Sequence, residues 1–515
     1  MRASKSRLRR ILTVGTVALL WTVLFAIAYS QSPLYTSNQN QYFLHGLTRA
    51  GYGVLDQDWL ANTGDPTPIF SALVALTYRL FHSLSIVYIY YAILMGIYLF
   101  SLYGIADKLF QIGSSKISSL LFLALMIVIH AAGLRFAFSR FIGSNWAYVL
   151  EDGVADQRML GPVFQPSTFG VLLLLSIFLF LDHKPLIAGL CAALAAILHP
   201  TYLLASGVLT ASYMWVTFRE NHRIKEPFLI GLSALLPILP MLVYLWGSFG
   251  GQASEITIRS RQILVDYRIP HHALVSQWLD ATALVKIGLV ALCIYLVRKQ
   301  RIFLILLLPF LVACSLTILQ VITRSYSLAL LFPWRISIFL VPLSTSLLIA
   351  ILITRLLSRP SLQSLRWQKA ITIASVLAVI LCVLVGGLRF ILDSQRKAQD
   401  AERRMQAYIY AQQSAQDTYL TPVKMQDFRL FTGASVYIDF KSIPYKDADV
   451  LEWYRRVQLA DRFYKEKDCE LLQSLSSEGV THAVLASEDL PLSCPMVQET
   501  YRDQDFAVYK LLSPH

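Results

Sequence analysis

Two aspartates near the start of the chain have the spacing of a catalytic or metal-binding pair. Asp56 and Asp58 flank Gln57 and are followed by Trp59. Two carboxylates beside an aromatic side chain can provide a general base, or can hold a divalent cation such as Mg²⁺ or Mn²⁺ that bridges a phosphate. The alternative is that both are solvated loop acids, because exposed aspartates are common on protein surfaces.

A second segment has the chemistry of phosphate binding. Arg268, His271 and His272 belong to one short run that also contains Tyr267 and Pro270. Cationic and imidazole groups placed together bind phosphate oxygens through charge-assisted hydrogen bonds. We therefore expect this segment to contribute to a phosphate site.

Two further side chains have both a functional and a structural interpretation. Arg335 can contact a lipid phosphate, or can extend along the apolar surface towards water. His199 is expected to be functional if it faces a cavity, but the adjacent Pro200 can end a helix without any chemistry. The charged residues of the segment 134–166 can line a donor site or pair with one another: Arg135, Arg140, Glu151, Asp152, Asp156 and Arg158.

The elements that must position these residues are mostly apolar. Of the 515 residues, 56% are hydrophobic and only 15% are charged, and the mean hydropathy is +0.53. Soluble domains carry about 25% charged residues. This composition excludes the soluble classes and indicates a protein buried in a membrane.

Eleven apolar runs predict eleven transmembrane helices within residues 1–390, since a helix needs about 20 apolar residues to cross a bilayer. A twelfth apolar segment, 67–84, is expected to be interfacial or re-entrant, with Arg79 and His82 reaching the surface. The alternative is a true twelfth span, compensated by merging the two short runs around His199-Pro200 into one span. The eleven runs are 11–29, 84–106, 117–133, 167–181, 185–199, 201–217, 228–247, 281–297, 302–321, 336–354 and 370–390.

The distribution of charge predicts the orientation. The net charge of +13 divides into +17 for residues 1–390 and −4 for residues 391–515. Threading eleven spans places 18 Lys and Arg but only 4 Asp and Glu on the side of the amino terminus, which the positive-inside rule assigns to the cytoplasm. The long segments 30–83, 134–166 and 248–280 then lie on the outer face, together with residues 391–515.

The carboxy-terminal segment 391–515 predicts a small soluble α/β domain. Strand-like runs at 434–440, 480–485 and 506–509 alternate with helical patterns near 450–464 and 469–477. Cys469 and Cys494 are the two cysteines outside the apolar runs. They can form a disulfide if this side is an oxidising compartment, or remain two free thiols. No cysteine and histidine spacing indicates a zinc site, and we expect no metal-ligating residues beyond the aspartate pair.

This arrangement resembles the GT-C superfamily of integral-membrane glycosyltransferases. In that superfamily the first outer loop is long, contains juxtamembrane helices and supplies an acidic catalytic residue; the corresponding loop here is 30–83, with Asp56 and Asp58 at its acidic centre. A second long outer loop follows the seventh span, and here that loop is 248–280. A soluble carboxy-terminal domain on the outer face is also common in the superfamily.

Further motifs resemble a narrower, uncharacterised family of bacterial GT-C-like membrane proteins, over nearly the whole chain. The motifs are loose and the family has no assigned substrate. They are Gln157…Gly161-Pro162…Gln165-Pro166-Ser167, His199-Pro200-Thr201-Tyr202, Tyr267-Arg268-Ile269-Pro270-His271-His272 and Phe428-Arg429-Leu430…Tyr437-Ile438-Asp439-Phe440-Lys441-Ser442…Pro444-Tyr445.

The resemblance implies an all-α, GT-C-like membrane bundle of about eleven transmembrane helices with a small carboxy-terminal α/β domain. It implies a glycosyltransferase that moves a hexosyl or pentosyl group from a polyprenyl-phosphate donor to a glycan, lipid or protein acceptor at the outer face of a bacterial inner membrane. Asp58 or Asp56 would be the base. Arg268, His271 and His272, together with Arg335 and His199, would bind the donor and stabilise the charge that develops on the leaving phosphate.

Two other classes of function remain open. A transporter or flippase of lipid-linked saccharide would carry ionisable residues in the middle of its spans and an inverted repeat, and neither is evident in the sequence. A non-catalytic membrane protein on a GT-C scaffold is also possible, because fold does not fix function. The sequence lacks a GxxxxGK[ST] motif and gives no support for nucleic-acid binding.

Overall fold

The computed structural model describes residues 2–250, 253–489 and 492–512. The chain divides into two compact units, each assembled from three segments. Unit 1 comprises Met1–Gln31, Val87–Leu242 and Ile269–Ile391, and unit 2 comprises Ser32–Ile86, Val243–Arg268 and Leu392–His515. Most of the predicted outer loop 30–83 and the first part of 248–280 therefore pack with the carboxy-terminal segment, whereas 134–166 belongs to unit 1.

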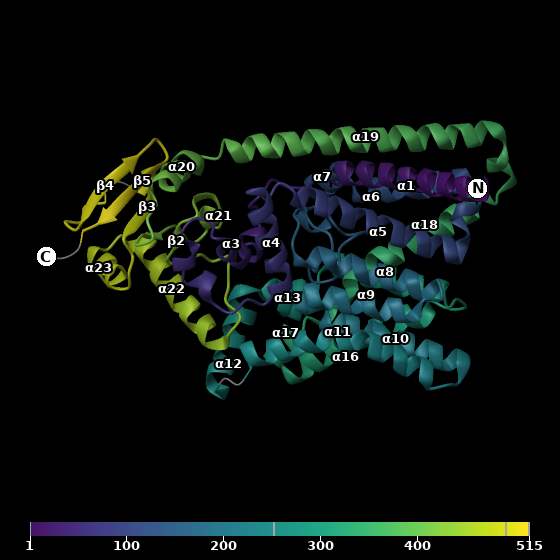
Figure 1. The fold of residues 1–515 in the computed structure, drawn as a ribbon, viewed down its shortest axis with the longest axis horizontal. Coiled ribbons are helices and arrows are strands. Elements are labelled where there is room, and N and C mark those ends of the chain that lie inside the picture. Colours follow the sequence, from purple (N-terminus) through teal and green to yellow (C-terminus); the bar gives the residue numbers. More distant parts are fainter. Residues whose placement is uncertain (1, 251–252, 490–491, 513–515) are drawn as a thin grey trace. The chain divides into compact units, whose positions relative to one another are not determined.

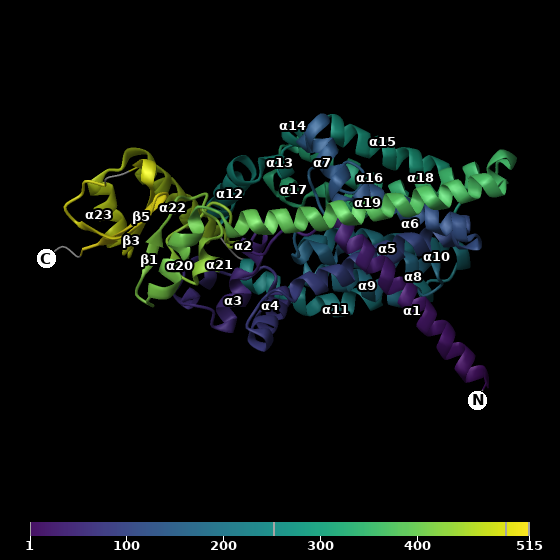
Figure 2. The same ribbon diagram turned by 90° about the horizontal axis from the view of Figure 1, so that it is seen from above.

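Unit 1 is built from α-helices, which lie side by side along much of their length (Figures 1 and 2). Each of the eleven predicted apolar runs contains a helix. The helices are α1 (Arg2–Tyr29), α5 (Val87–Phe110), α6 (Lys116–His130), α7 (Ala132–Phe141), α8 (Val171–Leu181), α9 (Pro185–Leu198), α10 (Leu203–Asn221), α11 (Lys225–Phe249), α13 (Pro270–Ala273), α14 (Val275–Trp278), α15 (Ala281–Leu296), α16 (Phe303–Thr323), α17 (Tyr326–Leu330), α18 (Ser337–Leu357) and α19 (Leu365–Ala398), with α11 and α19 continuing into unit 2.

Five helical segments among the described residues are long and apolar enough to cross a membrane. They are α5, α11, α16, α19 and the stretch Tyr326–Leu357 that contains α17 and α18; the bent pair α6 and α7 makes a sixth if it forms one span. Others are shorter, such as α9 with 14 residues, which at 1.5 Å per residue extends only about 21 Å. The chain is thus a mostly helical protein with five or six candidate membrane-spanning helices among its described residues, and the count of eleven spans stays a prediction.

Short helical turns connect these elements and place several of the predicted residues. His199 lies at the break between α9 and α10, where Pro200 starts a turn. Arg335 lies in the turn that leads into α18, a helix buried along most of its length. The short turns of unit 1 are Ile112–Ser114, Ser144–Trp146, Pro166–Gly170, Pro200–Tyr202, Pro333–Ile336 and Pro360–Gln363.

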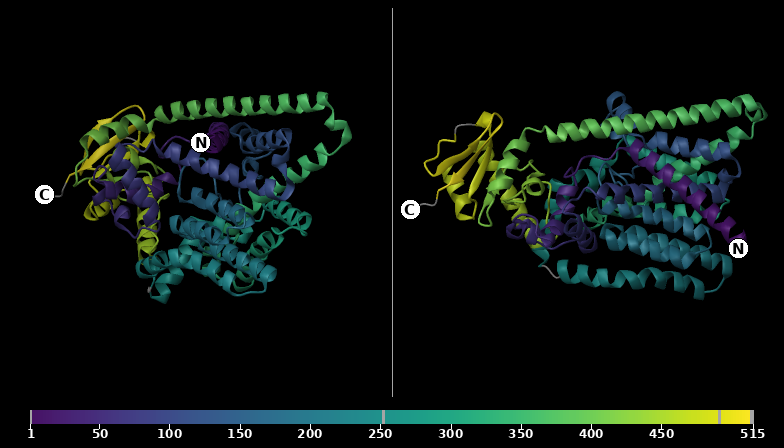
Figure 3. Two further views of the ribbon diagram at one scale, coloured as in Figure 1. Left: turned by 45° about the vertical axis from the view of Figure 1, so that its right-hand side comes forward. Right: turned by 45° about the horizontal axis from the view of Figure 1, so that its top comes forward.

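Unit 2 contains a five-stranded sheet in the order β2-β1-β3-β5-β4, in which β2, β1 and β3 are parallel and β5 and β4 run antiparallel to their neighbours. Strands β3 to β5 are yellow in Figure 3. The strands are β1 (Thr418–Leu420), β2 (Ser435–Val436), β3 (His482–Ala486), β4 (Val497–Arg502) and β5 (Phe506–Leu511). The small carboxy-terminal sheet expected from the sequence is confirmed, although the strand expected over 434–440 is reduced to two residues.

Alternate residues of the strands face two separate cores, as the two-residue period of a strand requires. In β3, Ala483 and Leu485 pack against α22 and α23, whereas Val484 packs with Met405 and Ile409 of α20. The helices of unit 2 are α2 (Gln39–Tyr42), α3 (Leu44–Ala50), α4 (Pro68–Phe81), α12 (Ser254–Gln262), α20 (Glu402–Gln412), α21 (Phe428–Thr432), α22 (Asp447–Glu466) and α23 (Cys469–Ser477), with shorter turns at Leu55–Gln57, Leu60–Asn62 and Ser487–Asp489 and a π-helical turn at Ile263–Arg268.

Two close backbone approaches depend on glycine. A Cβ atom on Gly46 of α3 would lie 2.6 Å from the Cβ of Val74 on α4, so glycine allows these helices to touch. A Cβ on Gly53 would lie 2.3 Å from the carbonyl oxygen of Gly433, and both glycines have positive φ. The first of these contacts places α4, which is the segment predicted to be interfacial, firmly within unit 2.

The structure joins Cys469 and Cys494 in a disulfide, at a sequence separation of 25. The bond connects the start of α23 to the chain that precedes β4. We predict that replacing both cysteines by alanine lowers the free energy of unfolding of unit 2 by about 3 kcal/mol, because the cross-link limits the freedom of the unfolded chain. Hydrogen exchange of peptides from β3 and β5, read by mass spectrometry, measures this effect.

A reductant provides the control for this prediction. It should accelerate exchange in the wild type to the level of the double variant, and should leave the double variant unchanged. Exchange that is equal in the wild type and in the variant would contradict the stabilising role.

Candidate functional site

Asp58 is completely buried, and its carboxylate is surrounded by hydrogen-bond donors. One oxygen accepts from the backbone N–H of Ala61 at 3.0 Å. The other accepts from Nε of Arg429 at 2.6 Å and from the N–H of Val436 at 2.9 Å. Both carboxylate oxygens of Asp58 are therefore occupied by donors from the protein itself.

Arg429 links Asp58 to a second carboxylate, that of Asp439. We call Asp58, Arg429 and Asp439 the buried triad. The guanidinium lies between the two carboxylates and donates to both, and all three side chains are at most 2% exposed. Asp439 also accepts from the N–H of Ser442 at 2.7 Å. The geometry therefore supports a role for Asp58 in joining segments of unit 2.

Asp56 has the opposite environment. Its side chain is exposed, and the contact recorded for it is a hydrogen bond from Nε2 of Gln57 at 2.9 Å. Of the two aspartates that the sequence singles out, Asp56 is therefore the one whose carboxylate is accessible to another molecule.

Arg335 lies at the centre of a polar cluster in unit 1. Its Nε donates to Oγ1 of Thr201 at 3.2 Å, one terminal nitrogen donates to Oε1 of Gln157, and the other lies 2.6 Å from Nε2 of His199. Because a guanidinium can only donate, Nε2 of His199 must be the acceptor. The sequence predicted Arg335 and His199 as donor-binding residues, and the structure brings them into contact.

The partners of Arg335 are all neutral. Within the described ranges, no carboxylate lies within 4.0 Å of its guanidinium. Two acids of the segment 134–166 have other partners: Glu151 lies 3.4 Å from Arg135, and Asp152 lies 2.7 Å from Arg158. Arg335 is thus a half-buried cation whose charge is not balanced by a neighbouring carboxylate.

His272 lies close to this cluster but remains uncharged. Its Nδ1 is 2.8 Å from the carbonyl oxygen of Ala155, so Nδ1 is the donor. Burial lowers the pKa of His272 to about 3, and the neighbouring His271 and the charges of Arg335 and Arg158 act in the same direction. Near neutral pH its imidazole is therefore neutral, with Nε2 available as an acceptor.

His271 and Arg268 have surroundings that differ from those of His272. His271 is exposed, and its ring centroid is 4.1 Å from that of His272. Arg268 belongs to unit 2, where it donates to the carbonyl of Lys441 at 2.7 Å and lies over the ring of Phe440. The structure thus assigns the predicted phosphate-binding residues to two units: His199, His271, His272 and Arg335 to unit 1, and Arg268 to unit 2.

A family model described as "Domain of unknown function (DUF6798)" matches residues 400–460 of the chain. The matched segment supplies Arg429 and Asp439 of the buried triad. No curated protein matches the chain.

Gln157 and Thr201 hold Arg335, although in the sequence they belong only to two loose motifs and no role is predicted for them. Both are neutral, and they lie 178 and 134 residues from Arg335. Their role as acceptors for Arg335 can be recognised only from the fold, which brings them to the guanidinium. No group of three or more His, Cys, Asp or Glu side chains that could hold a metal ion occurs in the part of the chain that the structure describes.

The neighbouring aspartates 56 and 58 form a matched pair for testing the buried triad. We predict that Asp58→Asn lowers the free energy of unfolding by about 3–5 kcal/mol, because it removes one partner of a buried charge. Asp56→Asn, at an exposed position, should change it by less than about 0.5 kcal/mol. Thermal or urea unfolding of the purified variants measures both, and equal stabilities would contradict the assignment.

The low pKa of His272 predicts a pH dependence. The unfolded chain binds a proton on this imidazole with a pKa of about 6.5, whereas the folded chain does so only near pH 3. The contribution of His272 is therefore fully present above pH 6.5 and is lost as the pH falls from 6.5 towards 3. The stability of His272→Gln should fall less steeply over this range than that of the wild type.

Thermal unfolding measured in steps of pH tests this prediction. The control is His222→Asn at an exposed position of unit 1, where asparagine tolerates the left-handed backbone. This variant should keep the wild-type slope. A slope that His272→Gln leaves unchanged would show that the imidazole titrates normally.

Proposed function

We propose that the chain is a glycosyltransferase of the GT-C type, which transfers a sugar from a polyprenyl-phosphate donor to an acceptor at the outer face of a bacterial inner membrane. The observation that supports this proposal most strongly is Arg335. A half-buried guanidinium that is positioned by His199, Gln157 and Thr201, with no carboxylate to balance it, is suited to bind an anion.

The reaction needs such a group. The bond between the sugar C1 and the phosphate oxygen breaks, the acceptor oxygen bonds to C1, and the acceptor proton passes to a base. The lipid phosphate leaves with one additional negative charge, which a preorganised guanidinium stabilises without reorganisation of water. Arg335 would bind the phosphate, and the neutral partners that hold it would not compete for its charge.

The base in this proposal is Asp56. Both oxygens of Asp58 are occupied by donors, and neutralising that side chain would leave Arg429 buried with a single carboxylate partner, Asp439. Asp56 is exposed and has only a neutral side chain beside it. A divalent cation, Mg²⁺ or Mn²⁺, could bind the same carboxylate, whereas Asp58 is committed to the buried triad.

The proposed topology has eleven spans, with the amino terminus in the cytoplasm and unit 2 outside. The disulfide between Cys469 and Cys494 supports this orientation, because disulfides persist in oxidising compartments. The excess of lysine and arginine in the loops assigned to the cytoplasm supports it as well.

The test compares two arginines of unit 1. We expect the purified full-length chain to bind undecaprenyl phosphate, and Arg335→Gln to weaken this binding by about tenfold or more, since a hydrogen bond to a charged group contributes roughly 1.5–3 kcal/mol. Arg324→Gln is the matched control, because Arg324 is exposed at the end of α16. Native mass spectrometry or a radiolabelled-lipid assay measures the binding.

The neutral lipid undecaprenol separates recognition of the phosphate from recognition of the chain. Equal binding of undecaprenol and undecaprenyl phosphate, or equal loss in both arginine variants, would contradict the proposal. Translocation of undecaprenyl-phosphate glucose across vesicles, without release of glucose from the lipid, would indicate a transporter instead.

A further inference from the structure

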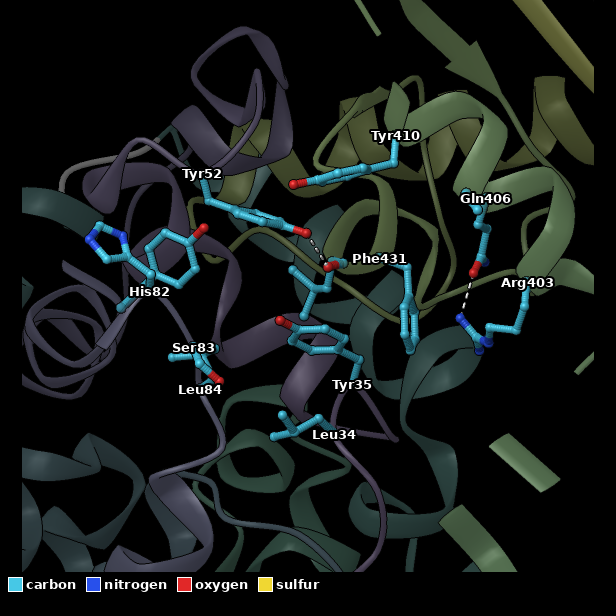
Figure 4. Close-up of a pocket in the computed structure, with 13 residues that line it drawn as sticks. Leu34, Tyr35, Tyr52, His82, Ser83, Leu84, Arg403, Gln406, Tyr410 and Phe431 are labelled. Carbon is cyan, nitrogen blue, oxygen red and sulfur yellow. Dashed lines mark hydrogen bonds between the residues drawn. The ribbon is translucent and has the colours of Figure 1, made fainter. Parts of the chain in front are cut away.

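Unit 2 contains a cavity that neither the triad nor the Arg335 cluster uses. Its volume is about 460 Å³, within the range of small-molecule sites. The first segment of unit 2 and the carboxy-terminal segment both contribute to its walls, as Figure 4 shows. Four tyrosines and one phenylalanine line it: Tyr35, Tyr52, Tyr78, Tyr410 and Phe431.

The aromatic rings are fixed against one another. Tyr35 meets Phe431 edge to face with ring centroids 5.0 Å apart, and Tyr52 meets Tyr78 in the same way at 5.3 Å. Tyr410 is 55% exposed, so its part of the cavity wall is accessible to solvent. The walls therefore offer flat apolar surfaces whose orientation is set before any ligand enters.

The phenol hydroxyls supply neutral hydrogen-bonding groups. The hydroxyl of Tyr52 donates to the carbonyl of Leu430 at 3.0 Å, which fixes its ring. The structure records no hydrogen bond to another described residue for the hydroxyls of Tyr35, Tyr78 and Tyr410. Burial raises the pKa of Tyr35 to about 12, so this hydroxyl keeps its proton near neutral pH.

The one permanent cation of the cavity wall is already compensated. Arg403 lies 3.5 Å above the ring of Phe431 and pairs with Asp427 at 2.7 Å and with Asp400 at 3.2 Å. It also donates to Gln406, as the dashed line in Figure 4 indicates. Arg403 therefore offers no unpaired positive charge to an anionic ligand, and a cationic ligand would meet the guanidinium.

We propose that this cavity binds a neutral saccharide. A sugar ring has an apolar face of C–H groups that packs against aromatic rings, and a rim of hydroxyls that both donates and accepts hydrogen bonds. The fixed tyrosine rings match the apolar face of the sugar. The hydroxyls of Tyr35, Tyr78 and Tyr410 match its rim of hydroxyls. Neither Arg335 nor Asp56 lines the cavity, so the proposal stands whether or not the chain transfers sugars.

Saturation-transfer difference NMR on the full-length chain in detergent tests the proposal, with maltose, cellobiose, lactose and N,N′-diacetylchitobiose as probes. We expect at least one of these disaccharides to receive saturation from the protein. Tyr410→Ala should weaken its binding by about fivefold or more, because the open wall loses its ring. Tyr410→Phe keeps the ring and should retain most of the binding.

Tyr295→Ala is the matched control, since Tyr295 is an exposed tyrosine of unit 1 and is 61% exposed. It should leave disaccharide binding unchanged. The proposal is overturned if none of the four sugars binds, if Tyr410→Ala binds as well as the wild type, or if inorganic phosphate competes with the sugars for the cavity.

Discussion

The fold of unit 2 depends on one buried guanidinium between two carboxylates. Arg429 is bonded to Asp58, 371 residues earlier in the chain, and to Asp439 on its own segment. Burying three charges costs several kcal/mol for each, and the cost is offset only where every oxygen and N–H has a partner. The donors to the triad come from the first segment of unit 2, Ser32–Ile86, and from its carboxy-terminal segment. The carboxy-terminal segment therefore reaches its observed structure only together with the first segment.

Pairing within the protein limits which charged side chains can contact another molecule. Asp58, which the sequence favoured equally with Asp56, is committed to the triad, and Glu151 and Asp152 of the segment 134–166 are paired with Arg135 and Arg158. Among the predicted site residues, Asp56 of unit 2 keeps an accessible carboxylate, and Arg335 of unit 1 is a cation that only neutral groups hold. The proposed transfer of a sugar from a lipid phosphate would use Arg335 to bind the phosphate.

Local patterns were sufficient for much of the fold. Apolar runs predicted the helices of unit 1, and the alternation in 480–485 and 506–509 predicted β3 and β5. They missed β1, which has three residues, and β4, which is mostly exposed and has no alternation. Burial of Asp58 and the contacts of Gln157 could not be predicted, because their partners lie more than 170 residues away.

The most direct test of the central claim is an electron cryomicroscopy structure of the full-length chain with undecaprenyl phosphate. We predict phosphate density within hydrogen-bonding distance, about 3 Å, of the Arg335 guanidinium, with His199 still beside it. It also predicts that Arg429 remains between Asp58 and Asp439. A phosphate bound elsewhere, with Arg335 still bonded only to Gln157, Thr201 and His199, would contradict the account.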